Sequence, residues 1–260
     1  MAEKQFYTDD ELIIRMWDVE EVKDVMAKHA YYYSAGQRRE ELVDIWVTKP
    51  DHRRTASLGF NNGFYQGLDD ISNYYVVQYN ELQKERLNPY IQANPDRKYT
   101  NLDLGLGVMA HHTSNTPLVY IAEDGRTAKY LGYDCGEQTI GRPDGTADAY
   151  FIFGLVFADL IKEDGAWKIW HLVLQHDHTI AVGSDYSEVP VLAEPGTDPY
   201  EAEFGTPTIQ RTVYDNFFGW EYLYQDMPKS YYTYEDDRGY GPNGCMGMKY
   251  YERERRYIYE

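Results

Sequence analysis

Apolar residues recur at helical spacing through the first part of the chain, which predicts one or two helices over residues 9–34. The repeated positions are Leu12, Ile13, Met16, Val19, Val22, Val25 and Met26. Asp9 or Asp10 can cap the first turn, and Gly36 can end the helix in a left-handed conformation. We therefore expect a long helix as the first element.

Two further helices and a pair of short strands are predicted before residue 90. Residues 38–47 have a helical pattern, and Pro50 is expected to end that helix. Its buried face is formed by Leu42, Ile45 and Trp46. Glycine and asparagine turns interrupt residues 55–67, which is typical of short strands, and residues 68–87 return to helical spacing.

After residue 104 the pattern changes to strand-like runs joined by turns. Asp124-Gly125 and Asp164-Gly165 are hairpin turn signals, and a loop rich in glycine, proline and aspartate lies between them. The expected strands cover residues 105–114, 117–122, 126–134, 149–161 and 166–182. Helices followed by a meandering sheet predict an α+β fold, in which a curved antiparallel sheet packs on N-terminal helices.

The composition changes near residue 185, which divides the chain into a domain at 1–185 and an extension at 186–260. The extension is first rich in proline and acid and then rich in tyrosine. It is too aromatic for plain disorder, so we expect an arm that packs on the core or on a neighbouring subunit.

The net charge of −18 argues against nucleic acid as a partner, because phosphate binding needs basic clusters. The basic clusters are short: Arg38–Arg39, His52–Arg53–Arg54 and Arg253, Arg255 and Arg256. No run reaches the roughly 18 apolar residues of a membrane span, and the first residues lack an apolar signal segment. Cys135 and Cys245 are too few for a disulfide framework, so we expect a cytoplasmic protein without a membrane partner.

Histidines are the most informative polar residues. In a strand, His111 and His112 point to opposite faces, so they cannot bind one metal ion together. His176 and His178 share a face and are an acceptable pair of ligands, but no further ligand cluster has a recognisable spacing. We expect neither a metal nor a cofactor, and a hydrogen-bonded strand residue is an equally good interpretation of any single histidine.

Alternation along the hairpin 149–178 predicts which side chains share a face. With a two-residue turn, Glu163 lies opposite Ala166 and Asp159 opposite Trp170. One face would then carry Phe151, Phe153, Phe157, Asp159, Trp170, Leu172, Leu174 and His176. Such a face suits an aromatic pocket with few polar groups, although Asp159 can also be an ordinary strand-end residue near solvent.

The other face of this hairpin carries small aliphatic residues, so both faces have the character of buried surfaces. One would be covered by helices and the other by a partner subunit, which predicts a homodimer or homotrimer. At the end of the first helix, "HAYYYSAG" spreads three tyrosines around the helix. At least one, Tyr32 or Tyr33, should face the sheet and could donate its hydroxyl to a substrate oxygen.

The order of elements and four stretches resemble the SnoaL-like group of the nuclear transport factor 2 (NTF2) superfamily. These stretches are "YYYSAGQRREELVDIWV", "GFNNGFYQGLDDISNYYV", "HTSNTPLVYIAEDGRTAKY" and "FADLIKEDGAWKIWHL", within residues 10–180. The resemblance implies a cone-shaped fold with a pocket at its open end and cofactor-independent chemistry. The chain is most similar to the longer members that act as lignin diarylpropane γ-formaldehyde lyases.

The resemblance also implies roles for single residues. It makes His112 the general base, with Asn115 three residues later, and it expects an aspartate near the end of the first helix to orient that histidine. Ala35 occupies the matching position, so either Asp159, Tyr32 or Tyr33 takes the role of the missing carboxylate or the chemistry differs.

We expect a lyase that acts on a hydroxylated aromatic or polycyclic small molecule by proton abstraction. An isomerase is the second candidate enzyme. His112, Asp159, Tyr33 and Tyr32 are the candidate catalytic residues. The candidate substrate-binding residues are Trp170, His176, Phe153, Phe157, Tyr133 and Asn115. A non-catalytic binding or assembly protein on the same scaffold is the main alternative, and a metal-dependent enzyme using His176 and His178 is the third.

Overall fold

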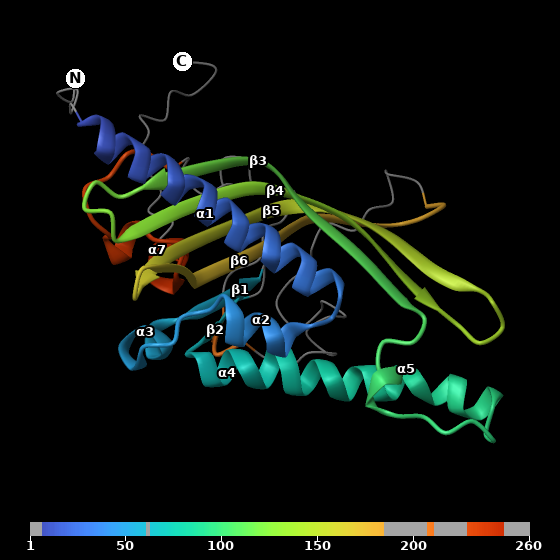
Figure 1. Ribbon diagram of the computed structural model, residues 1–260. Helices are drawn as coiled ribbons and strands as arrows, with labels where there is room; N and C mark the ends of the chain where they lie inside the picture. Colours follow the sequence, from blue (N-terminus) through green and yellow to red (C-terminus); the bar gives the residue numbers. More distant parts are fainter. Residues whose placement is uncertain (1–6, 61–62, 185–206, 211–227, 247–260) are drawn as a thin grey trace, which may run out of the picture.

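The computed structural model describes residues 7–60, 63–184, 207–210 and 228–246. One curved sheet forms its centre, and helix α1 (Asp9–Ser34) crosses one face of that sheet (Figure 1). The predicted α+β class is confirmed. No helix in these ranges is both long and apolar enough to cross a membrane.

Helix α1 begins with a capping box. The side chain of Thr8 accepts the N–H of Glu11, and the Glu11 carboxylate accepts the N–H of Thr8 at 2.8 Å. This reciprocal pair satisfies two free donors of the first turn, so Thr8 is the cap rather than Asp9 or Asp10. As predicted, the helix ends before Gly36, which has φ 67°.

Helix α2 (Arg38–Asp44) is shorter than predicted, because the residues that follow it join the sheet. Trp46 forms an isolated parallel bridge with Ile169. Leu42, Ile45 and Trp46 are buried, which confirms their predicted face.

Pro50 begins helix α3 (Pro50–Thr55) instead of ending a helix. Proline suits the first helical position, where its missing N–H would have no intrahelical partner. The Glu163 carboxylate accepts the N–H groups of Thr48 at 2.8 Å and of Lys49 at 3.2 Å, which fixes the start of this helix on the β-hairpin.

The helix predicted at 68–87 is continuous but changes its winding. Helix α4 (Leu68–Ser72) passes through a π-helical segment, η1 (Asn73–Gln78), into α5 (Tyr79–Ala93). Tyr74 and Tyr75 lie in the π-helical turns and are buried. Such turns are frequent at functional sites because they re-aim the side chains that they carry.

The sheet has the strand order β3-β4-β5-β6-β1-β2-β7. Its long strands are β3 (Val108–Ile121), β4 (Thr127–Gly141), β5 (Ala147–Glu163) and β6 (Ala166–Ala181). The short ones are β1 (Ser57–Phe60), β2 (Gly63–Gln66) and β7 (Ile209–Gln210). The sheet is mixed rather than purely antiparallel, because β1 pairs in parallel with β6.

Two strands are longer than predicted. The loop expected over 136–148 is mostly strand, since β4 runs to Gly141 and β5 starts at Ala147. The far ends of β3, β4 and β5 therefore extend beyond α1 as a long arm beside α5 (Figure 1).

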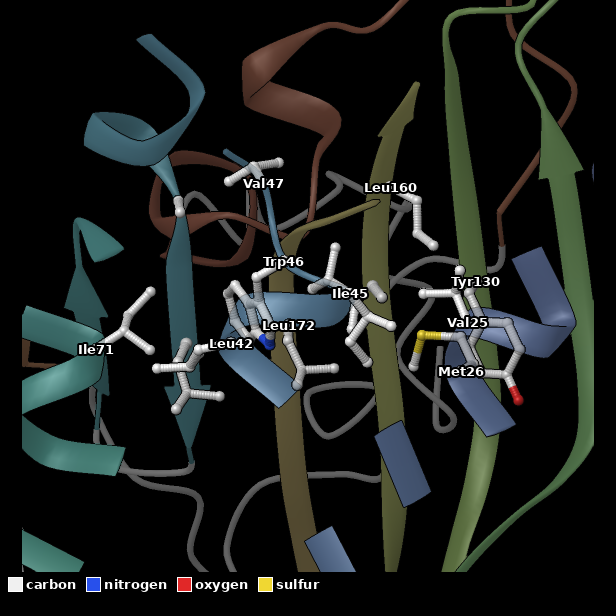
Figure 2. Close-up of a cluster of buried hydrophobic side chains, with 14 of the residues drawn as sticks. Val25, Met26, Leu42, Ile45, Trp46, Val47, Ile71, Tyr130, Leu160 and Leu172 are labelled. Carbon is white, nitrogen blue, oxygen red and sulfur yellow. The ribbon is translucent and has the colours of Figure 1, made fainter. Parts of the chain in front are cut away.

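Two apolar layers cover opposite faces of the sheet. Figure 2 shows the larger one, in which Val25 and Met26 of α1 and Trp46 after α2 lie against Leu160 and Leu172 of the sheet. On the opposite face, Phe157, Val173 and Tyr240 form a second cluster.

The described part of the C-terminal extension covers that second face. Helix α7 (Pro242–Met246) lies behind the sheet, on the side away from α1 (Figure 1). Tyr240 packs at 5.3 Å from the ring of Phe157, and β7 pairs with β2. These parts therefore pack on the core of their own chain.

Candidate active site

A small cleft opens between the C-terminal half of α1 and the sheet. Its lining residues come from one helix and four strands: His29, Ala30, Tyr33, His112, Ser114, Asp134, Val156 and Leu174. Its innermost part has room for about one water-sized molecule. A cleft that combines two imidazoles, a carboxylate and a phenol with apolar walls suits proton transfer.

His112 and Asp134 form the central pair of the cleft. Nδ1 of His112 lies 3.2 Å and 3.3 Å from the two carboxylate oxygens of Asp134, and both side chains are 7 % exposed. Ser34, the last residue of α1, accepts the backbone N–H of His112 at 3.0 Å. The end of the helix thus holds the strand position that carries the imidazole.

Neighbouring strands bring a third group beside this pair. Asp134 lies opposite Gly154, and Gly154 lies opposite His176. With no side chain on the glycine between them, Nε2 of His176 lies 4.0 Å from the Asp134 carboxylate. The rings of His112 and His176 are 6.3 Å apart and nearly parallel.

The protonation states of these neighbours follow from their surroundings. Burial alone would raise the pKa of Asp134, but the hydrogen bond with His112 and the charges of His112 and His176 lower it below its ordinary value. Burial lowers the pKa of His176 to about 4. At neutral pH the site therefore holds an ionised Asp134 beside a neutral His176.

Tyr33 closes one side of the cleft. Its ring meets the ring of His112 edge-on, with the ring centres 4.6 Å apart and the planes at 81°. The centre of its ring is also 5.9 Å from that of His29. The tyrosine predicted to face the sheet is therefore Tyr33. Tyr32 points elsewhere, and its hydroxyl donates to Asp44 at 3.0 Å.

A second imidazole–carboxylate pair lies at the back of the cleft. Nδ1 of His29 is 2.9 Å from Glu41, which is completely buried. Glu41 also accepts the indole N–H of Trp46 at 3.1 Å and the hydroxyl of Tyr75 at 2.7 Å. Three donors fix this carboxylate, so the ring of His29 is held in one orientation.

The predicted aromatic face of the β5–β6 hairpin is wrong. A bulge between Asp159 and Leu160 places Asp159 opposite His171 instead of Trp170. The extra residue reverses the alternation on β6, so Leu172 and Leu174 face α1 while Asp159 and Phe157 face the other way. His176 lies on the same face as Leu172 and Leu174, because the second register shift, between Phe153 and Gly154, comes only after it along β6.

Asp159, Phe157 and Trp170 therefore lie outside the cleft, whereas Leu174 lines it. Asp159 is completely buried, accepts Nζ of Lys129 at 3.0 Å and accepts the N–H of Tyr240. Trp170 donates to Thr55 at 2.9 Å and lies 4.7 Å from the ring of Tyr234.

The remaining predicted residues do not line the cleft. Tyr133 is 53 % exposed and Phe153 is 36 % exposed. The amide of Asn115 donates to Thr113 at 3.1 Å and does not line the cleft.

Asp134 is the residue that the sequence analysis missed. The expected carboxylate near Ala35 is absent, and Asp134 supplies one from β4. A bulge at Asn115–Leu118, where Thr116 has φ 51°, shifts the β3–β4 register by one residue. Counting back from the Asp124-Gly125 turn without that bulge places Asp134 on the opposite face to His112, so only the Thr116-Pro117 irregularity hints at the pair.

No group of three or more histidine, cysteine, aspartate or glutamate residues within the described ranges is arranged to hold a metal ion. The metal hypothesis also uses His178, whose side chain is not among those that the structure describes.

One comparison with known proteins identifies the type of domain. A model of the SnoaL-like domain family matches residues 15–173. No curated protein matches the sequence.

Several solved structures are similar to the chain at low identity and low TM-score. The Kfla4162 protein from Kribbella flavida is 12 % identical, with a TM-score of 0.45, over 64 % of this chain and 94 % of its own. A scytalone dehydratase-like protein from Novosphingobium aromaticivorans is also 12 % identical, with a TM-score of 0.45, over 66 % and 97 %. The hexachlorocyclohexane dehydrochlorinase LinA-type3 from Novosphingobium barchaimii is 12 % identical, with a TM-score of 0.43, over 66 % and 94 %. At these values the structures add nothing to the family match.

Proposed function

The chain belongs to the SnoaL-like domain family, and we propose that it is a cofactor-independent lyase in which His112 is the general base. The observation that carries this proposal is the contact of His112 with the buried carboxylate of Asp134 at 3.2 Å, on the wall of the cleft. Imidazole held by a carboxylate is a common arrangement for moving protons at neutral pH.

The geometry supports a division of roles within the pair. When Nδ1–H of His112 donates to the ionised Asp134, the lone pair of the neutral imidazole is on Nε2. Nε2 then removes a proton from a carbon or hydroxyl of the substrate. The carboxylate stabilises the imidazolium that results, because the two charges are opposite and little water reaches them.

The elimination then balances as follows. The electron pair of the broken C–H bond forms the new double bond, and a β leaving group departs with its bonding pair. The protonated His112 returns its proton to the leaving group. If the reaction is a deformylation, His112 removes the hydroxyl proton of a primary alcohol. The C–C bond to that alcohol carbon then breaks, and formaldehyde departs. The electron pair of the broken C–C bond forms the new double bond, and the β leaving group is expelled.

A hydroxylated aromatic compound is the proposed substrate class, because Tyr33 presents a ring beside the base. A non-catalytic binding protein is the second candidate. An assembly role on the same scaffold is favoured by the size of the cleft, whose innermost part admits about one water-sized molecule. Turnover separates the two candidates, since a binding protein has no rate to measure.

The test is to incubate chelator-treated protein with hydroxylated diaryl, phenylpropanoid and steroid compounds. New conjugation is followed by ultraviolet absorbance and formaldehyde by a colour assay. Formaldehyde together with an absorbance change identifies deformylation, whereas an absorbance change alone identifies dehydration or isomerisation. Silence across the panel with tight binding of one compound would favour the binding protein.

The histidine next in sequence provides a matched control. His112→Ala should lower kcat by about 10²–10⁴-fold, which is the usual contribution of a general base. His111→Ala should leave kcat unchanged, because His111 points away from the cleft and its side chain is 63 % exposed. A His112→Ala variant with the wild-type rate would remove His112 as the base.

A further inference from the structure

Arg38, the first residue of α2, is a cation surrounded by tyrosine rings. Its guanidinium carbon lies 3.5 Å from the ring centre of Tyr79, 4.6 Å from that of Tyr75 and 4.9 Å from that of Tyr33. The π-helical turn η1 and the start of α5 supply two of these rings, and Figure 1 shows α2 lying between α1 and α4. Contacts of this kind stabilise a cation by replacing part of its hydration.

The rings do not satisfy the hydrogen-bonding capacity of Arg38. Its Nε is buried without an acceptor, and within the described residues the guanidinium forms no ion pair. By contrast, Arg53, Arg97 and Arg142 each pair with an aspartate. In a chain with 43 acidic and 25 basic residues, a half-buried guanidinium without a carboxylate is unusual.

The missing partner has a definite chemistry. A guanidinium presents its N–H donors in one plane, and a carboxylate can accept two of them side by side. The N–H groups along the edge of the guanidinium are the place for such an acceptor. The π-faces nearby would also hold an aromatic ring attached to the carboxylate.

Arg38 is connected to the base of the cleft through Tyr33. Tyr33 contacts Arg38 at 4.9 Å and His112 at 4.6 Å, so the guanidinium and the imidazole lie within about 10 Å of each other. One substituted aromatic ring can span that distance. A ligand held at Arg38 would therefore lie along Tyr33 with its far end toward His112.

We propose that Arg38 is an anion-binding residue next to this cleft, separated from it by Tyr33, and that the substrate is an aromatic compound with a carboxylate. The second half of this proposal rests on the proposed lyase function, because only an enzyme has a substrate. Anion binding at Arg38 does not depend on turnover. A local cation is needed here because the protein as a whole repels anions, with a net charge of −18.

The experiment measures binding rather than activity. The probes are 4-hydroxyphenylacetate and its amide, 4-hydroxyphenylacetamide, which differ in charge but hardly in shape. Isothermal titration of the complete chain gives their dissociation constants. The wild-type protein should bind the carboxylate roughly tenfold or more tightly than the amide.

Three variants locate the effect. Arg38→Gln should weaken carboxylate binding by roughly tenfold or more and leave amide binding unchanged, and Arg38→Lys should fall between the two. Arg39→Gln is the matched control, since Arg39 is the exposed neighbour with the same charge, and it should have no effect. Circular dichroism shows whether each variant is folded.

The outcomes are distinguishable. Equal affinity of the wild-type protein for the two probes overturns the proposal, even if Arg38→Gln does not fold. Unchanged carboxylate binding by a folded Arg38→Gln variant also overturns it. Arg38-dependent binding without turnover of any carboxylated compound would support the anion site while removing the lyase function.

Discussion

At the scale of single residues, the site depends on which carboxylate holds which histidine. Asp134→Asn should lower kcat by about 10²-fold or more, because an amide can donate to Nδ1 and so favour the tautomer with the proton on Nε2. Glu137→Gln is the matched control. Glu137 makes the same kind of contact with His111, at 3.2 Å, on the exposed side of the same two strands. A variant pair with equal rates would show that the Asp134 carboxylate has no role in turnover.

The pH dependence of kcat gives a second readout of the same change. The pKa of Asp134 lies below its ordinary value and that of His176 is about 4, so neither group changes its charge above about pH 6. Neither group should therefore give the kcat profile of the wild-type protein a limb above about pH 6. A limb in that range that is lost in Asp134→Asn would contradict the low pKa of Asp134.

His112 could be predicted from the sequence but its partner could not. The resemblance selects His112 over His111, and alternation excludes the two as one metal pair. Asp134 depends on the bulge near Thr116, and a single inserted residue reverses every side chain beyond it. The same effect at Asp159–Leu160 moved Asp159 from the predicted pocket to the opposite face.

At the scale of strands, Gly154 of β5 lies between Asp134 of β4 and His176 of β6. A Cβ on Gly154 would lie 1.9 Å from the carbonyl oxygen of Gln175, so β5 and β6 could not keep their spacing. Gly154→Ala should lower the free energy of unfolding by on the order of 1–3 kcal/mol and reduce kcat, because His176 moves relative to Asp134. Urea denaturation and steady-state rates measure the two effects.

Gly132→Ala is the comparison on the neighbouring strand. Its nearest contact would be the Ser114 hydroxyl at 2.5 Å, a side-chain atom that can rotate away. The loss of stability should therefore be smaller than in Gly154→Ala. Equal losses would mean that the Gly154 backbone contact does not limit the packing of β5 on β6.

The strands illustrate which elements a sequence pattern can predict. The two hairpin turns and the long helix follow from local signals, such as Asp164 with φ 51° and Gly165 with φ 87°. The start of α3 at Pro50 and the length of β4 depend on distant partners, such as Glu163 and the arm of β5. Local propensity could not specify these contacts.

At the scale of the whole molecule, a buried ion pair holds the described C-terminal segment on the outer face of the sheet. Asp159 accepts Nζ of Lys129 at 3.0 Å and the N–H of Tyr240, and Lys129 also donates to the carbonyl of Arg238 at 2.7 Å. Lys129 lies 4.6 Å from the ring of Tyr240 and 5.7 Å from that of Tyr234. The extension thus covers an apolar face that the sequence analysis assigned to a partner subunit.

This arrangement separates a structural role of Asp159 from the catalytic role predicted for it. Asp159→Asn leaves the Lys129 charge without a buried partner, so the free energy of unfolding should fall by about 3–5 kcal/mol. Limited proteolysis should then cut within residues 228–246 sooner than in the wild-type protein. Adding Lys129→Met to Asp159→Asn should restore part of the lost stability, because it removes the unpaired charge. Folded Asp159→Asn protein should keep kcat near the wild-type value, since Asp159 faces away from His112. A loss of kcat as large as that of His112→Ala would show that Asp159 takes part in catalysis.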